Sequence, residues 1–197
     1  MSALQLTIIF LVVFAFGAVI GSFLNVCIYR IPAGQSVVRP RSCCPLCGTA
    51  IRWYHNLPIL SWLLLQGKCA YCGASFSIRY PLVEALNGLL FVIFFYRFAF
   101  HPVTPVIWLL SATLVVISFI DLDHQIIPDV ISLPGIVVGF ACSFLVPWVT
   151  WQESLAGILL GGGSLMLIAL GYECVTKQEG MGFGDVKLLA MLGAFLG

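Results

Sequence analysis

Long apolar runs, interrupted by short polar stretches, dominate the chain. Six apolar segments can be placed, at about residues 4–28, 82–100, 104–120, 131–149, 154–173 and 186–197. Runs of about 18 or more apolar residues with few charges are typical of helices that cross a bilayer. The first five segments are therefore predicted to be transmembrane helices. The sixth is too short to span, and it is either a half-inserted helix or the start of a truncated one; truncation after Gly197 is the favoured interpretation.

The composition supports a membrane protein. Hydrophobic residues make up 61% of the chain and charged residues only 9%, whereas soluble domains carry about 25% charged residues. No Lys or Arg precedes Arg30, so the first segment lacks the basic region of a signal peptide and is interpreted as a retained helix. We expect an all-α polytopic membrane protein, a helical bundle in contact with membrane lipid. The net charge of +1 gives no reason to expect nucleic-acid binding.

The basic residues predict an orientation. Six of the nine lie between residues 30 and 80: Arg30, Arg39, Arg41, Arg52, Lys68 and Arg79. Because cytoplasmic loops are enriched in Lys and Arg, this loop is predicted to be cytoplasmic and the N-terminus to lie outside. Alternation then makes loops 121–130 and 174–185 cytoplasmic as well. The expected organisation is a first transmembrane helix over 1–29, a cytoplasmic loop over 30–80 and a membrane domain over 81–197.

Two C-x-x-C pairs lie in the cytoplasmic loop, with 21 residues between them. Four thiolates satisfy the tetrahedral preference of Zn²⁺, and a site filled by four protein ligands is structural rather than catalytic. The predicted ligands are Cys44, Cys47, Cys69 and Cys72. Each pair is followed by a glycine that eases the turn around a metal. Cys43 offers an alternative register, the metal could be iron, and two reduced or redox-active pairs are the competing interpretation.

Aspartates gather in two motifs at the predicted cytoplasmic edge. Asp121 and Asp123 follow the third apolar segment, and Asp185 ends the sequence Gly182-Phe183-Gly184-Asp185 before the sixth. An ionisable group near the hydrocarbon is costly and is a functional candidate by default. Two facing carboxylates would share a proton, so that one acts as general base on water while the other polarises a carbonyl. Helix capping by Asp129 or Asp185 is the structural alternative.

These motifs belong to a longer ordered series. It comprises Gly21-Ser22-Phe23-Leu24-Asn25, Tyr29-Arg30, the cysteine pairs, Asn56-Leu57-Pro58, Ser61-Trp62, Arg79-Tyr80-Pro81-Leu82-Val83-Glu84 and the two aspartate motifs. The series resembles the type IV prepilin peptidases, bacterial inner-membrane enzymes within the wider GxGD group of aspartyl proteases. The resemblance covers nearly the whole chain and implies further apolar segments beyond Gly197.

The resemblance implies specific roles. The catalytic pair would be Asp121 and Asp185, with Asp123 as the alternative first residue. Gly182, Gly184 and Lys187 would support the pair. The substrates would be prepilin and pseudopilin precursors of type IV pili and type II secretion, which carry a basic leader before an apolar helix.

A second activity is also implied, the N-methylation of the new N-terminus with S-adenosylmethionine. It would belong to the region around the zinc loop, with Asn25, Arg30 and Glu84 as candidates for its pocket. A different class of function is a non-enzymatic membrane assembly factor that uses the zinc module to hold a partner. That alternative gives no reason for the paired aspartates.

Overall fold

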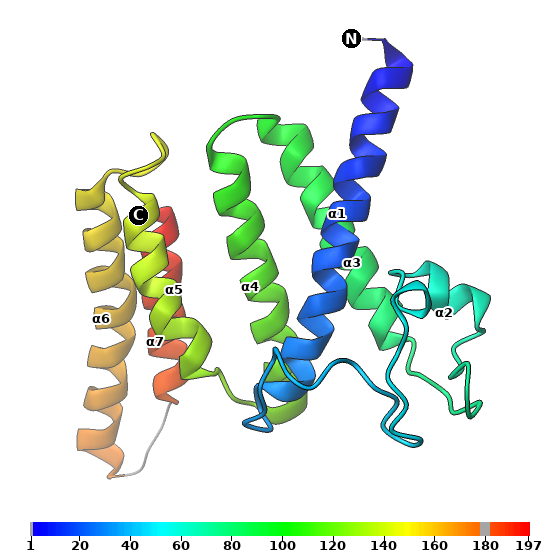
Figure 1. The fold of residues 1–197 in the computed structure, drawn as a ribbon. Coiled ribbons are helices and arrows are strands. Elements are labelled where there is room, and N and C mark those ends of the chain that lie inside the picture. The colour runs from blue at the N-terminus through cyan, green and yellow to red at the C-terminus, as the bar shows by residue number, and fades with distance from the viewer. Residues whose placement is uncertain (1, 178–181) are drawn as a thin grey trace. The chain divides into compact units, whose positions relative to one another are not determined.

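The computed structural model describes residues 2–177 and 182–197, and these residues form helices joined by turns and loops. Chain order runs through helices α1 (Ala3–Arg30), the short η1 (Trp53–His55) and α2 (Leu60–Leu64), then α3 (Arg79–Phe98), α4 (Val103–His124), α5 (Asp129–Cys142), α6 (Trp151–Thr176) and α7 (Phe183–Leu196) (Figure 1). The described part of the chain has no named strand, only two isolated bridges in the cysteine loop. The all-helical prediction is confirmed.

Helices α1, α3, α4 and α6 are long and apolar enough to cross a membrane. Capping boxes begin two of them: Ser2 pairs with Gln5 at α1, and Thr150 with Glu153 at α6. In each box the side chains satisfy backbone N–H groups that the first helical turn leaves free.

The structure corrects the expected fourth span. Helix α5 ends at Cys142 and has 14 residues, although the apolar sequence continues to Val149. At a rise of about 1.5 Å per residue, α5 is about 21 Å long, shorter than the roughly 30 Å hydrocarbon core. Turns follow at Ser143 to Val146, directly before Pro147, and proline disfavours helical backbone at the residue before it. The apolar run was therefore longer than the helix it contains.

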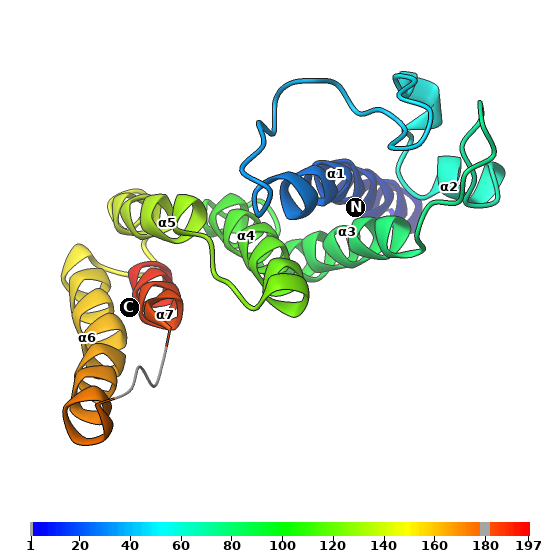
Figure 2. The ribbon, with the colours of Figure 1, turned by 90° about the horizontal axis from the view of Figure 1, so that it is seen from below.

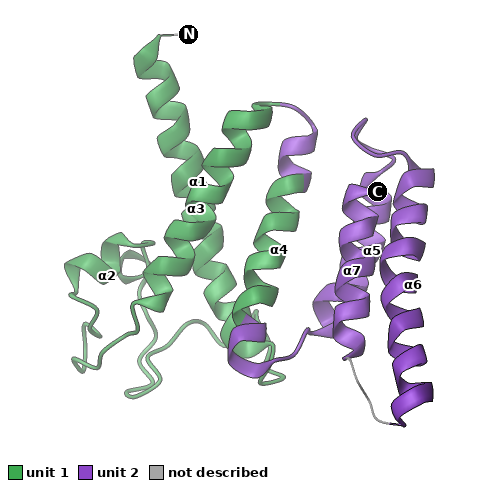
Figure 3. Cartoon of the chain, turned by 180° about the vertical axis from the view of Figure 1, so that it is seen from behind, with its two compact units in different colours: residues 1–100, 107–119 green, residues 101–106, 120–197 purple. Residues whose placement is uncertain are grey.

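The chain divides into two compact units, residues 1–100 with 107–119 and residues 101–106 with 120–197 (Figure 3). In the first unit, α1 and α3 lie side by side (Figures 1 and 2). A Cβ at Gly17 would lie 2.9 Å from the Gly88 Cα, and Asn87 Nδ2 donates to the Gly17 carbonyl at 2.7 Å. Trp108 of α4 stacks on Phe91 of α3 at 4.6 Å between ring centroids. Small residues thus set the helix spacing, and aromatic residues fill the space beside it.

In the second unit, α7 packs against both α5 and α6. The backbones of α6 and α7 touch at Gly157 and Gly193, where a Cβ on either glycine would overlap the other's carbonyl. Gly161 and Gly162 likewise face Leu189 and Ala190, whereas no described residue lies within 4 Å of a Cβ added at Gly163. Small residues permit such close approach between membrane helices. Gly161 and Gly162 therefore lie at the contact between α6 and α7, and Gly163 does not.

Candidate functional site

The four predicted metal ligands converge. The sulfur atoms of Cys44, Cys47, Cys69 and Cys72 all lie within 4.8 Å of one another. Cys44 Sγ and Cys72 Sγ are 3.7 Å apart, close to the edge of about 3.8 Å expected for a tetrahedron with Zn–S bonds of about 2.3 Å. Cys43 lies outside this cluster, so the geometry favours the register with Cys44. The donor set and its spacing fit a zinc ion.

The two cysteine pairs have the same backbone. The Gly48 N–H donates to the Cys44 carbonyl at 2.9 Å, and the Gly73 N–H donates to the Cys69 carbonyl at 3.0 Å. Both glycines have positive φ, 66° and 72°, and open space where a Cβ would be. Conformation rather than crowding therefore requires glycine at these two positions. The predicted turn-forming role of Gly48 and Gly73 is confirmed.

Hydrogen bonds in and around the cluster shift the pKa values of Cys47 and Cys72 in opposite directions. Hydrogen bonds from the side chain and backbone of Thr49 lower the pKa of Cys47 to about 6. The Ala74 backbone favours the thiolate of Cys72, but burial and the hydrogen bonds shared with the other thiols raise its pKa to about 12. Clustered thiols share protons in this way, and a metal ion displaces them because thiolate is the form that binds metal.

A cavity of about 490 Å³ lies beside this cluster in the first unit. Its size falls within the range of about 300–1,000 Å³ that is usual for small-molecule sites. Its wall combines the end of α1, the start of α3 and the cysteine loop, including the metal ligand Cys69. The predicted pocket residues Asn25, Arg30 and Glu84 all line it. Three residues far apart in the sequence thus meet at one cavity.

Each of these three residues also forms a hydrogen bond within the wall of the cavity. Asn25 Nδ2 donates to the Tyr80 carbonyl at 3.1 Å, which ties α1 to the first turn of α3. Arg30 donates to the Ser36 carbonyl at 2.9 Å. The Glu84 carboxylate accepts a hydrogen bond from the Ile59 N–H at 2.7 Å. His55 was not singled out from the sequence, yet it lines the same cavity and its Nδ1 is buried without a hydrogen-bond partner among the described residues.

The first aspartate motif ends α4. Asp121 and Asp123 lie in its last turns and are exposed. The helix stops where Gln125 takes a left-handed conformation and its N–H donates to the Asp121 carbonyl at 2.8 Å. Two residues before Asp121, the Phe119 carbonyl accepts a 2.9 Å hydrogen bond from Arg79, whose guanidinium lies over the Phe119 ring at 4.8 Å.

The second motif begins α7. Gly182 is the N-cap residue and Asp185 lies in the first helical turn with an exposed side chain. No side chain of the described residues caps this helix. The capping alternative for Asp185 is therefore wrong, although a carboxylate in the first turn still interacts favourably with the helix dipole. Residues 178–181, which complete the predicted loop 174–185, lie outside the described residues.

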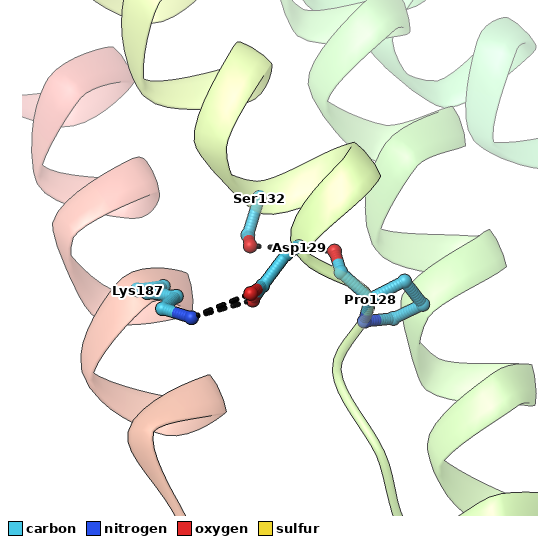
Figure 4. A network of polar contacts seen from close by, with 4 residues as sticks. All are labelled: Pro128, Asp129, Ser132 and Lys187. Atoms are coloured by element: carbon cyan, nitrogen blue, oxygen red, sulfur yellow. Dashed lines mark hydrogen bonds and ion pairs between the residues drawn. The ribbon is translucent and has the colours of Figure 1, made fainter.

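Two contacts join the start of α7 to the segment that follows Asp121. A Cβ at Gly184 would lie 3.0 Å from the Ile127 Cβ. Lys187 Nζ lies 2.7 Å from both carboxylate oxygens of Asp129 (Figure 4). Asp185 is flanked by these two contacts. The structure thus brings the flanking residues of the two motifs together across 58 positions of sequence.

Asp129 is the residue whose role the sequence misassigned. Pro128 rather than Asp129 is the N-cap of α5, and no side chain caps that helix. Asp129 occupies the first helical position and forms the ion pair with Lys187 instead. Its place in an aspartate-rich segment was the available signal, but local sequence rules do not report a partner so distant in the chain.

These features define a membrane protein with a four-cysteine metal module and two aspartate motifs joined at one end of a helical unit. The chain belongs to the type IV leader peptidase family. Residues 15–98 match the Bacterial Peptidase A24 N-terminal domain, and residues 108–197 match the Type IV leader peptidase family. Together with the four apolar helices, this family indicates a bacterial inner-membrane protein.

Curated relatives carry one name. The chain is 46% identical over 185 residues to the prepilin leader peptidase/N-methyltransferase of Myxococcus xanthus, covering 93% of this chain and 55% of that protein. It is 38% identical to the Neisseria gonorrhoeae protein of the same name, covering 92% of this chain and 72% of the relative. The corresponding Pseudomonas putida protein is 37% identical, with 92% and 70% covered. The chain thus spans little more than half of the first relative's length. No solved structure matches it.

Proposed function

We propose that this chain carries an aspartyl leader peptidase with Asp121 and Asp185 as its catalytic pair. The observation that carries the proposal is the joining of the two motifs through Ile127 with Gly184 and Asp129 with Lys187. The family and the names of the relatives support prepilin cleavage. The alternative function, a non-enzymatic assembly factor, does not explain why the two aspartate motifs are joined. The comparisons do not favour this alternative.

The chemistry follows from two carboxylates that share a proton. The ionised carboxylate takes a proton from a water molecule, whose oxygen attacks the scissile carbonyl. The protonated carboxyl donates a hydrogen bond to the carbonyl oxygen as negative charge develops there. Asp123 remains the alternative to Asp121. Among the described residues, the nearest atom to an added Cβ at Gly182 would be the Gly184 nitrogen at 4.0 Å, which leaves room for a substrate backbone close to the start of α7.

The proposed substrates are prepilin and pseudopilin precursors. Their basic leader stays in the cytoplasm by the positive-inside rule. In the proposed orientation the N-terminus lies outside, and the short helix α5 crosses together with the apolar residues 143–149 that follow it. The ends of α4 and α6 and the starts of α5 and α7 then face the cytoplasm. The scissile bond, between leader and apolar helix, then lies at the depth of the aspartates. Apolar side chains exposed on α1 and α6 would contact lipid.

The test is cleavage of a synthetic prepilin by the purified full-length protein. We expect Asp121→Asn and Asp185→Asn each to abolish cleavage while the protein still inserts into membranes, and Asp123→Asn to retain most activity. Loss of cleavage in Asp123→Asn alone would move the first catalytic role to Asp123. Normal cleavage by Asp185→Asn would reject the aspartyl mechanism.

For the second activity, we propose that the 490 Å³ cavity binds S-adenosylmethionine and the trimmed N-terminus. Bound there, the cofactor supplies a methyl group to the free amine. The domain division proposed is residues 1–29 as the first transmembrane helix, 30–80 as the methyltransferase-associated zinc loop and 81–197 as the peptidase. Methyl transfer to a trimmed pilin peptide tests this part, and its absence in a metal-loaded, cleavage-competent sample would reject it.

A further inference from the structure

Ile59 has a strained backbone at the edge of the cavity. Its φ and ψ are 61° and −51°, and a β-branched residue with positive φ is a genuine outlier. The Leu60 N–H donates to the Pro58 carbonyl at 2.5 Å, which closes a three-residue turn of the rare, strained type. Strain of this kind persists only where surrounding contacts determine it, and it is enriched at functional sites.

The strained turn is held by Glu84. The Ile59 N–H donates to Glu84 Oε2 at 2.7 Å, and the Ser22 side chain also hydrogen-bonds to this carboxylate. Glu84 is only 7% exposed, and Ser22, Ile59 and Glu84 all line the cavity. Residues from α1, the cysteine loop and α3 thus converge on one buried carboxylate.

Both of these hydrogen-bond donors are neutral. When ionised, a buried carboxylate that receives only neutral hydrogen bonds lacks a counter-charge, and buried groups of this kind normally take up a proton or acquire a cationic partner. Two cationic side chains, Arg30 and Lys68, line the same cavity. Arg30 donates to the Ser36 carbonyl, and neither cation forms an ion pair with Glu84 among the described residues. The site therefore has the chemistry of a receptor for a small cation.

We infer that Glu84 binds a primary ammonium group of a ligand in this cavity. The inference rests on the proposed methyl transfer, which offers two sources for that group. One is the α-ammonium of S-adenosylmethionine, and the other is the new α-ammonium of the trimmed precursor. A charge-assisted hydrogen bond to the carboxylate orients either of them.

Two binding measurements on the full-length, zinc-loaded protein separate the sources. The first is calorimetric titration with S-adenosylmethionine. The second compares a trimmed pilin peptide that has a free N-terminus with the same peptide N-acetylated. We expect Glu84→Gln to weaken one of two properties about tenfold or more: the affinity for S-adenosylmethionine, or the preference for the peptide with a free amine. This is the loss that removal of a hydrogen bond to a charged group predicts. Glu173→Gln, an exposed carboxylate on α6, is the matched control.

A purely structural role for Glu84 makes a different prediction. If Glu84 served only to hold the strained turn, Ile59→Gly would relieve the strain, because glycine accepts positive φ. The double variant Glu84→Gln/Ile59→Gly would then regain binding. We expect it to fold at least as well as Glu84→Gln and still bind poorly.

The outcomes are distinguishable. Weaker binding of S-adenosylmethionine assigns the ammonium to the methyl donor, and loss of preference for the free amine assigns it to the substrate. Unchanged binding in Glu84→Gln, or recovery in the double variant, overturns the inference and leaves the proposed function standing. If the unaltered protein binds neither ligand, the methyltransferase proposal fails and the inference fails with it.

Discussion

Lys187 Nζ lies 2.7 Å from both carboxylate oxygens of Asp129, although the two side chains are 30% and 56% exposed. An ion pair this exposed contributes little stability in water, about 0–1 kcal/mol. Its position is more informative than its energy, because it joins the first turns of α5 and α7 within two residues of Asp185.

We predict that Lys187→Met reduces prepilin cleavage about 10- to 100-fold, the loss expected when a reacting group moves by about 1 Å. The exchanged pair Asp129→Lys/Lys187→Asp should restore part of the activity, which a general loss of stability would not allow. The initial rate of cleavage measures both effects. Lys177→Met is the control, and equal rates for the two single variants would contradict a positioning role.

Arg79 should be sensitive even to a conservative change. Its guanidinium both donates to the Phe119 carbonyl and lies over the Phe119 ring, and lysine cannot reproduce a planar stack with a directed hydrogen bond. We expect Arg79→Lys to lower the cleavage rate because the end of α4 that bears Asp121 is held less firmly. Arg97→Lys, at the other end of α3, should cleave normally; a matching loss there would indicate a general effect of Arg-to-Lys exchange.

The adjacent residues Cys43 and Cys44 allow a controlled test of which cysteine binds the metal. We predict that Cys44→Ser lowers bound zinc well below one ion per chain, whereas Cys43→Ser leaves the metal content unchanged. The reason is that Cys44 belongs to the sulfur cluster and Cys43 does not. Elemental analysis of the purified variants measures this. The reverse result would establish the other register.

Substitution of two glycines in α6 by alanine should have different effects on the stability of the protein. At Gly157 an added methyl group would meet the backbone of Gly193, but at Gly163 it would meet nothing. We expect Gly157→Ala to destabilise the detergent-solubilised protein by about 1–3 kcal/mol through overpacking. Gly163→Ala should be neutral or gain up to about 1 kcal/mol from helix propensity. Thermal unfolding measures both, and similar shifts would mean that α6 and α7 do not pack as described.

The sequence predicted those parts of the molecule that depend on local patterns. Apolar runs identified the helices, and the spacing of Cys44, Cys47, Cys69 and Cys72 identified the metal cluster, because both patterns impose geometry on neighbouring residues. The end of α5 at Cys142 was missed, since an apolar run does not distinguish a helix from the apolar turns after it.

Contacts between residues far apart in the sequence could not be predicted from local sequence patterns. Nothing near Asp129 indicates Lys187, and nothing near Ile59 indicates a positive φ at a β-branched residue. Resemblance to the family did single out Glu84, but not its contact with that turn. The tertiary structure determines such partners, and they are the residues on which the proposed chemistry depends.

Cys69 belongs both to the sulfur cluster and to the wall of the cavity, while the aspartate motifs lie in the other compact unit. The proposed methyl transfer therefore depends on the supply of zinc, whereas the proposed cleavage does not. On these two proposals, a bacterium starved of zinc would still cleave its precursors but would leave their new N-termini unmethylated.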